Sequence, residues 1–219
     1  RFTNVKVAAE DMIGKPGEGL KIALSTLNAG RLGIPAATGG VLKGLFKDMK
    51  DWTNDRVQWG VSIGKHQSIS KKIASMSADL FAMESLVYMA CSYADKENAD
   101  IRLEAAAAKY FCTEHGWRVL DELLQVRGGR GFETDKSLYH RGDRPIPIGR
   151  NLKDSRVGRI FEGSTEVMHL IMAREAMDTH FKIMMPLLMP KKGETRSKMS
   201  LILNAVKFYA TWLTSQYMP

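Results

Sequence analysis

The sequence predicts an all-α protein organised as an up-down four-helix bundle. Apolar residues recur three and four positions apart along most of the 219-residue chain, which is the spacing of an amphipathic helix. The apolar stripe over residues 69–89 is narrow, as expected for helices that pack side by side in a bundle. After Val7, no segment shows the alternating pattern of a convincing strand.

The first helix is predicted after a glycine-containing loop at residues 14–19. Its apolar face comprises Leu20, Leu24, Leu27, Leu42, Leu45, Phe46 and Met49. Pro35 lies inside this helix, and we expect it either to kink the helix or to lie where packing compensates for its missing N–H donor. Residues 60–64, with a glycine at each end, interrupt the pattern.

The second helix carries the stripe Ile69, Ile73, Met76, Leu80, Met83, Leu86 and Met89. Its methionines favour core filling over a promiscuous binding surface, because they fall within the stripe. After a polar connection at residues 95–100, a third helix is predicted from about Ile101 to Val126. Gly128 and Gly129 end it, because glycine readily adopts the left-handed conformation found at many helix C-termini.

The rest of the chain is predicted to form a long loop, a fourth helix and a linker. Residues 132–151 show no helical periodicity, so a loop is expected there. Ser164 is a natural N-cap, and Glu166 places negative charge in the first turn of the helix that follows. This helix fades near Pro186, and residues 190–193 are predicted to form a linker.

These elements predict three parts. Residues 1–14 are expected to be the end of a preceding β domain, with a short strand remnant at residues 2–7, and a linker. Residues 15–188 are expected to form the bundle domain, and residues 189–219 the start of a C-terminal helical extension. Because the chain begins with an arginine inside the predicted strand, we expect it to belong to a longer protein.

Charge and cysteine usage restrict the possible partners and compartments. The net charge of +8, with a pI near 9.5, favours nucleic acid, an anionic membrane or phosphate-rich small molecules, and does not choose among them. Cys91 and Cys112 lack a CxxC spacing, which indicates reduced, packed thiols in a bacterial cytoplasm or a mitochondrial matrix. No signal peptide, spanning segment or set of metal ligands is predicted.

The strongest functional signal is the carboxylate of Glu162. It follows two bulky apolar residues, Ile160 and Phe161, and precedes Gly163 at a junction between a loop and a helix. A carboxylate that is poorly solvated by such neighbours is suited to removing a weakly acidic proton. On spacing alone, a surface acid ahead of a helix is the simpler interpretation.

Five segments together resemble one family. Residues 160–164 (IFEGS) resemble the signature I-Y/F-E-G-T/S, and residues 125–132 (QVRGGRGF) resemble Q-x-x-G-G-x-G-Y/F. Residues 56–60 (RVQWG), followed by His66 and Gln67, resemble R-x-x-F-G with its later glutamine. Residues 28–31 (NAGR) and the opening residues 2–7 (FTNVKV) complete the set. In this order, the motifs resemble the C-terminal helical domain of the acyl-CoA dehydrogenase family.

The resemblance implies oxidation of an acyl-CoA thioester to its trans-2-enoyl product, with FAD as the hydride acceptor. Glu162 would be the base that takes the α-proton, and its backbone N–H would help to hold the thioester oxygen, as in an oxyanion hole. Arg31, Gly163 and Arg174 would lie on the substrate side. Without the motif, Arg31 is more simply a cation on the surface of a helix.

The resemblance also implies residues that contact FAD, some of them the FAD of a neighbouring subunit. They are Arg56, Gln58, Trp59, His66, Gln67, Gln125, Gly128, Gly129, Ser164 and Glu166. A homodimer or homotetramer is therefore expected, and an electron-transfer flavoprotein is the expected electron acceptor. The glycines do not form a dinucleotide-binding G-x-G-x-x-G, because they follow a predicted helix rather than a strand.

Two features depart from the family pattern. The 33 positions from Gly129 to Glu162 exceed the usual gap, and the excess resembles an insertion at residues 140–149. The chain also continues past the usual end of the bundle, as in the very-long-chain branch, whose extra domain associates with membranes. Two interpretations of this extension stay open, namely peripheral contact with a membrane and an ordinary packed helix.

Two other functions stay open within the same family. One is a nucleic-acid-binding protein like the alkylation-response flavoprotein, which the basic charge permits. The other is a role in assembly or as a scaffold. The presence of the family's base, Glu162, favours the enzyme over nucleic-acid binding.

Overall fold

The computed structural model describes residues 1–97, 99–189 and 197–217. It divides into two compact units, residues 1–169 and residues 170–219, which are described separately. The division falls within one helix and differs from the boundary predicted at residue 188, which stays a prediction. The predicted linker at 190–193 lies outside the described residues.

The first unit is formed almost entirely by helices. They are α1 (Gly19–Asp55), α2 (Gln67–Ala94), α3 (Arg102–Arg127), α4 (Gly129–Phe132), α5 (Asp135–His140), α6 (Ile148–Gly158) and the beginning of α7 (Thr165–Leu188). Short 3-10 helices lie at Ala9–Asp11 and Ile63–Lys65, and the strands β1 (Val57–Gln58) and β2 (Val61–Ser62) pair between them.

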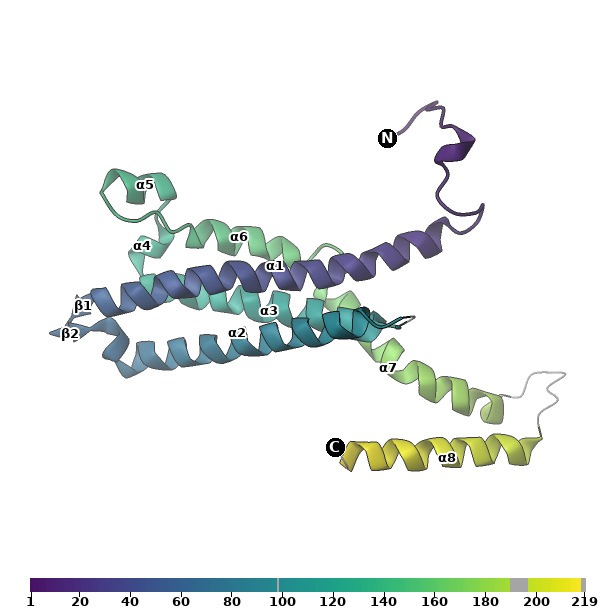
Figure 1. Ribbon diagram of the computed structural model, residues 1–219. Coiled ribbons are helices and arrows are strands. Elements are labelled where there is room, and N and C mark those ends of the chain that lie inside the picture. The colour runs from purple at the N-terminus through teal and green to yellow at the C-terminus, as the bar shows by residue number, and fades with distance from the viewer. Residues whose placement is uncertain (98, 190–196, 218–219) are drawn as a thin grey trace. The chain divides into compact units, whose positions relative to one another are not determined.

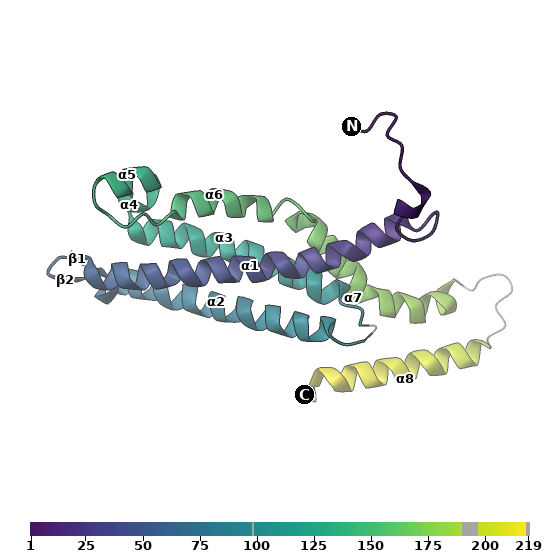
Figure 2. The same cartoon turned by 45° about the horizontal axis from the view of Figure 1, so that its top comes forward.

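The four long elements α1, α2, α3 and α6 form an up-down bundle (Figures 1 and 2). Helix α3 is central, because it packs against α1, α2 and α6. This confirms the all-α prediction. The fourth helix of this bundle is α6. The sequence analysis predicted a loop at residues 132–151, where the structure has α5 and the first turn of α6, and it made no prediction for the rest of α6. Only Ile148 and Leu152 form its inward stripe, so the apolar period is too short to recognise.

The core lies between α1, α2, α3 and α6. It consists of Leu42, Leu45, Met49, Met76, Leu80, Met83, Cys112, Val119, Leu120, Leu123, Val126, Ile146 and Ile148. The core role expected for the methionines is confirmed for Met76 and Met83 but not for Met89, whose side chain is 44% exposed. Both cysteines are free thiols, and Cys112 is buried.

Helix α1 runs without a break through Pro35, which is buried, so packing compensates for the missing donor. A tight hairpin follows α1, with Val57 paired to Ser62 and Gln58 to Val61. Trp59 and Gly60 form its turn with φ of 51° and 80°.

The strand predictions were wrong in two places, because a strand was predicted at residues 2–7 and none was predicted after Val7. The predicted strand at residues 2–7 is absent, because a strand needs a hydrogen-bonded neighbour and no described segment pairs with it. The strands β1 and β2 were missed because two residues each are too few to show an alternating pattern.

The second unit contains the rest of α7 and the helix α8 (Lys198–Tyr217), as the amphipathic pattern predicted. The two helices meet at His180, whose ring contacts Phe208, Tyr209 and Trp212. His180 Nδ1 lies 3.2 Å from the Tyr209 hydroxyl. Within the described ranges, none of the helices has the length and hydropathy of a membrane-spanning segment.

Candidate functional site

Glu162 lies in the loop between α6 and α7, and this loop packs against α1. The Arg31 Nε–H of α1 donates to the Glu162 carbonyl oxygen at 3.4 Å, and its Nη1 donates to the Asn28 side-chain oxygen at 3.2 Å. Arg31 is buried, so the surface-cation interpretation does not hold. Two predicted site residues, 131 positions apart, are thus brought together by the fold.

The carboxylate of Glu162 rests on Gly30. A methyl group at position 30 would lie 2.9 Å from the Glu162 Cδ and 3.0 Å from its Oε1, so only glycine leaves this space. Among the described residues, Glu162 Oε2 is buried without a hydrogen-bond partner. The shielding comes from α1 and not from the sequence neighbours, since Ile160 and Phe161 are 57% and 42% exposed.

The backbone of this loop adopts an uncommon conformation. Glu162 and Gly163 have φ of 51° and 105°, two successive positive values. A positive φ in a non-glycine residue is sterically unfavourable and needs support from its surroundings. Gly163 is required for a further reason, because a side chain there would collide with Met168, whose sulfur would lie 3.3 Å from its Cβ.

A lysine that the sequence analysis did not select supports the loop from α3. The side chain of Lys109 is 0% exposed, and its Nζ donates to the Gly163 carbonyl oxygen at 2.5 Å. Burial lowers the pKa of the Lys109 ammonium, and the nearby Arg31 lowers it further. The carboxylates of Glu162 and Glu114 act in the opposite direction.

Glu114, also on α3, ties the two ends of the loop together. Its Oε1 accepts from Arg159 Nε at 2.7 Å and from the Thr165 hydroxyl at 2.5 Å. Burial alone would raise the pKa of Glu114, but these two hydrogen bonds together with the charges of Arg159 and Arg118 outweigh it, and the pKa lies below its ordinary value. The Thr165 N–H donates to the Arg159 carbonyl oxygen at 3.1 Å, so the loop is closed on itself.

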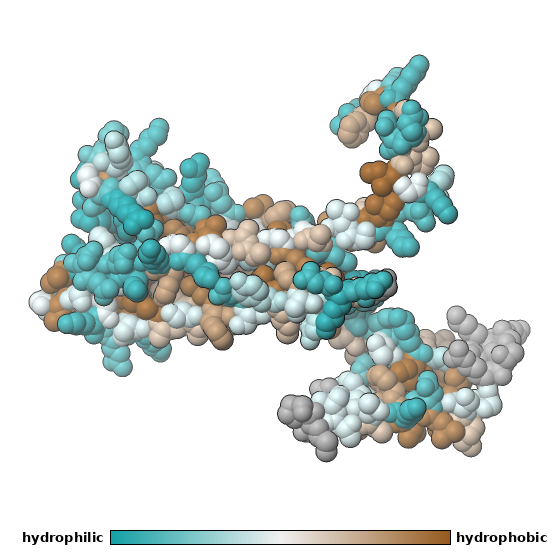
Figure 3. All heavy atoms as spheres, in the orientation of Figure 1, coloured by the Kyte–Doolittle hydropathy of each residue, from teal (hydrophilic) through white to brown (hydrophobic). Residues whose placement is uncertain are grey.

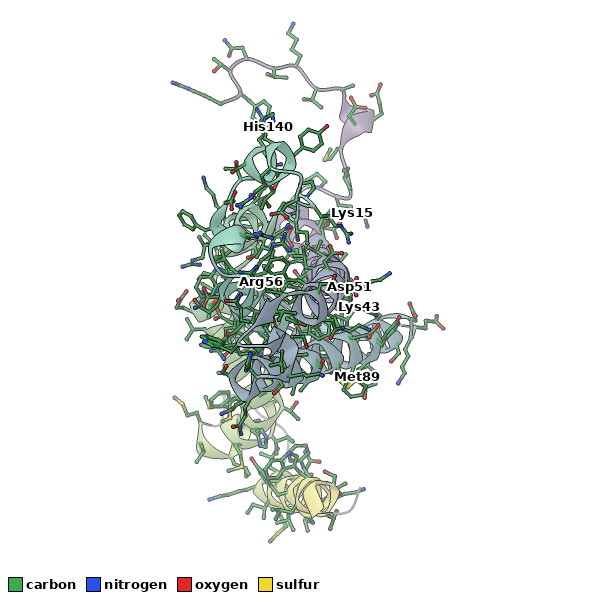
Figure 4. The ribbon with its side chains drawn as sticks, turned by 90° about the vertical axis from the view of Figure 1, so that its left-hand side faces the viewer. Lys15, Lys43, Asp51, Arg56, Met89 and His140 are labelled. Carbon is green, nitrogen blue, oxygen red and sulfur yellow. The ribbon has the colours of Figure 1, made fainter. Side chains whose placement is uncertain are left out.

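A second site, the hairpin-end pocket, lies where α1 ends and α3 passes into α4. It has a volume of about 590 Å³. Six predicted cofactor residues line it: Arg56, Gln58, Trp59, His66, Gly128 and Gly129. Figure 4 looks onto this end of the bundle, with Arg56 near its middle and His140 at its margin. Hydrophilic residues gather over the neighbouring α4 and α5 (Figure 3).

Arginines surround Trp52 on the inner wall of the hairpin-end pocket. The guanidinium carbons of Arg127, Arg130 and Arg56 lie 4.8, 5.1 and 6.0 Å from its ring centroid. Arg127 is buried, and in the described part of the chain its Nε has no hydrogen-bond partner. A buried guanidinium with a spare donor suits an anion such as a phosphate group.

The mouth of the pocket carries an aromatic side chain. Trp59 is 89% exposed, at the tip of the hairpin, and its ring lies edge-on to His66 with centroids 5.5 Å apart. His66 Nε2 lies 3.1 Å from the Gln58 carbonyl oxygen, which holds the imidazole against the hairpin. An exposed indole of this kind offers a face on which a flat ring can stack.

The predicted insertion at residues 140–149 is anchored beside this pocket. Arg144 pairs with Asp48 of α1 at 2.7 Å, and Asp143 pairs with Arg130 at 3.2 Å. Ile146 and Ile148 are buried in the core. The segment therefore belongs to the packed structure, and its ion pairs hold Arg130 at the pocket wall.

The other predicted cofactor residues do not line the hairpin-end pocket. Gln67 begins α2 and Gln125 lies near the end of α3, both exposed. Ser164 and Glu166 lie beside Glu162, and the Ser164 hydroxyl caps α7 by accepting from the Val167 N–H at 3.5 Å. Hydrogen bonds from its own amide and then from Ser164 lower the pKa of the Glu166 carboxyl.

The predicted residues thus lie in two groups, one near Gly30 and the other near Trp52 of α1. Gly30 and Trp52 are 22 positions apart in this helix, about 33 Å at the rise of an α-helix. Arg174 is exposed in the second unit, and its substrate-side role stays a prediction.

Sequence reasoning missed Gly30, Trp52, Lys109, Glu114 and Arg127. One signal was available for Lys109, since Ala105, Lys109 and Cys112 follow one another at helical spacing on a single face. A lone lysine on an apolar face is a candidate for burial with a specific partner. The others depend on contacts with distant segments, which no local pattern reveals.

Comparisons with known proteins agree on one family. The family model described as acyl-CoA dehydrogenase, C-terminal domain matches residues 17–177. The probable acyl-CoA dehydrogenase FadE10 of Mycobacterium tuberculosis is 45% identical over 213 residues, which cover 97% of this chain and 33% of that protein. The mitochondrial very long-chain specific acyl-CoA dehydrogenase of Mus musculus is 36% identical over 172 residues, covering 78% and 25%.

Solved structures give the same result. The butyryl-CoA dehydrogenase of Megasphaera elsdenii superposes with a TM-score of 0.72 at 33% identity, covering 80% of this chain and 43% of that one. A chain from a structure of the electron transferring flavoprotein of Acidaminococcus fermentans has a TM-score of 0.72 at 30% identity, covering 80% and 43%. The chain spans about a third or less of the length of the curated relatives named above.

Proposed function

We propose, because the chain belongs to the acyl-CoA dehydrogenase family, that it is the helical domain of an enzyme that oxidises acyl-CoA thioesters to trans-2-enoyl-CoA. Glu162 would be the base that removes the proton from the α-carbon. One observation carries this proposal, namely the Glu162 carboxylate, which rests on Gly30 with a buried oxygen that has no partner among the described residues. A carboxylate with an unsatisfied oxygen is free to accept a proton from a substrate.

The residues around Glu162 support this role by fixing its position. Arg31 and Lys109 hold two successive carbonyl oxygens of the loop, and Glu114 closes the loop from α3. Because the main chain is held, the carboxylate needs little reorganisation when the proton is transferred. With the loop held in this way, the backbone N–H of Glu162 would donate to the thioester oxygen.

The hairpin-end pocket fits part of FAD. Arg56 and Arg127, whose Nε has no hydrogen-bond partner among the described residues, suit a diphosphate, and the exposed Trp59 suits an aromatic ring. Gln58 and His66 would add polar contacts at the rim. When bound, FAD supplies the acceptor for the hydride that leaves the β-carbon.

Because the two groups of residues are far apart, we expect each FAD to be held by residues of two subunits. Ser164 and Glu166 lie beside the base, whereas the hairpin-end pocket lies about 33 Å away along α1. We infer that Ser164 and Glu166 contact the FAD of the same active site and that the pocket receives the FAD of a neighbouring subunit. A homodimer or homotetramer follows from this arrangement.

The remaining parts of the proposal concern partners and location. An electron-transfer flavoprotein would reoxidise the cofactor, and fatty acid β-oxidation in a bacterial cytoplasm or a mitochondrial matrix would be the setting. Peripheral membrane contact through α8 stays a proposal. The arginine-rich pocket does not favour nucleic acid, because Asp143 and Glu133 already pair with Arg130 and Arg141.

The test uses the full-length protein with FAD bound. Glu162→Gln removes the base but keeps the shape of the side chain, so we expect unchanged FAD absorbance and a loss of flavin bleaching by acyl-CoA under anaerobic conditions of about 10²-fold or more. The control is Glu84→Gln, which removes an acid that pairs with Lys43 on the outer face of α1 and α2. Bleaching at the normal rate in Glu162→Gln would exclude Glu162 as the base.

A further inference from the structure

Lys109 is a buried charge for which the proposed reaction has no direct use. Among the described residues it is the only buried lysine, and its side chain has no exposed surface. Transfer of an ammonium group into a protein interior is strongly unfavourable unless specific partners compensate. The type of residue at this position of α3 therefore needs an explanation beyond helix packing, which an apolar side chain of similar size would satisfy.

The partner of Lys109 is the peptide group next to the base. Its Nζ donates to the Gly163 carbonyl oxygen at 2.5 Å, while Arg31 donates to the preceding carbonyl oxygen, that of Glu162. Two cations, from α3 and α1, thus hold two successive carbonyl groups. These belong to the two residues with positive φ, so the contacts support the part of the loop that is least favourable by itself.

The charges around Lys109 alternate in sign. On α3, Glu114 faces it, and Glu114 is itself paired with Arg159. From the loop, Glu162 faces it, and from α1, Arg31 does so. The two carboxylates therefore compensate in part for the burial of the Lys109 ammonium group.

We propose that Lys109 is a positioning residue, which holds the Glu162–Gly163 loop in its left-handed conformation. This inference rests on the proposed role of Glu162 as the base. Lys109 need not touch the substrate, because it acts through the main chain of the loop. It links the central helix of the bundle to the geometry of the reaction.

The experiment compares two substitutions in the full-length protein with FAD bound. Lys109→Met keeps the apolar stem and removes both donor and charge, whereas Lys109→Gln keeps a donor for the Gly163 carbonyl oxygen and removes only the charge. The control is Lys72→Met, which breaks an ion pair with Glu122 between α2 and α3, away from the loop. For each variant we would measure FAD content, thermal unfolding, kcat and KM.

Lys109→Met is expected to keep FAD and to lose about 10²-fold in kcat with little change in KM, as expected for a misplaced base. Lys109→Gln should recover part of this kcat, because its amide can still donate to the Gly163 carbonyl oxygen. Lys72→Met should leave kcat and KM unchanged.

Three results would overturn the proposal. A kcat for Lys109→Met close to that of the unchanged protein would exclude a positioning role. A loss of kcat that follows FAD loss or unfolding would assign Lys109 to structure alone. Failure of both variants to fold would do the same. If Glu162→Gln abolishes bleaching while Lys109→Met has no effect, the proposed function stands and only this inference fails.

Discussion

Gly30→Ala is expected to separate activity from stability, because the added methyl group meets only the end of the side chain of Glu162, the proposed base. In the structure it would lie 2.9 Å from the Glu162 Cδ and 3.0 Å from Oε1. Ordinary carbon–carbon contact is about 3.5–4.0 Å, so the carboxyl group must move by about 0.6–1.1 Å. No backbone atom is that close, and the loop itself can stay in place.

The expected cost in rate follows from this displacement. A misplacement of about 1 Å can reduce a rate by about 10²-fold, so kcat should fall by about ten- to a hundredfold. Stability should change in the other direction, since alanine in a helix interior is favoured over glycine by roughly 0.5–1 kcal/mol. The variant should therefore unfold at the same temperature as the unchanged protein or slightly higher.

The assay is anaerobic flavin bleaching by acyl-CoA in the full-length protein, together with thermal unfolding. Gly44→Ala is the matched control, because it makes the same change in α1 at an exposed position where nothing lies within 4 Å of the new methyl group. Normal activity in Gly30→Ala would refute the contact between Glu162 and α1. A large loss of stability would show that the methyl group meets something more rigid than a carboxylate.

Two further predictions concern the hairpin-end pocket and the closed loop. Arg56→Ala should weaken FAD retention after dialysis through loss of a phosphate contact, measured by flavin absorbance against Lys47→Ala on the same helix, and full retention would exclude this contact. Glu114→Gln should lower stability at neutral pH. The folded-state pKa of Glu114 is depressed, so its contribution is present above the unfolded value near 4.5 and is lost as pH falls through the folded pKa. Thermal unfolding of both proteins between pH 7 and pH 3 should show the difference shrinking below about pH 4.5, and a constant difference would contradict the assignment.

The helices could be found from the sequence because they leave local patterns, whereas Glu162 was selected because its segment resembles a family motif. The stripe of α2 predicted its buried face at Met76 and Met83, and the Ser164 N-cap placed the start of α7 correctly. Where an element was short, the pattern failed. Helix α6 was not predicted because its inward stripe has only two apolar residues, and β1 and β2 were missed because they have two residues each.

The sequence by itself determined which residue types are present and which helical face each of them occupies, and its resemblance to the family motif marked Glu162 as the expected base. Only the tertiary structure decided what surrounds that carboxylate. Gly30, Arg31 and Lys109 reach the loop of Glu162 from two other helices, although at least 53 positions separate them from it in the chain. The physical reason is that solvation, backbone support and charge depend on distances in space, whereas periodicity depends only on distance along the chain.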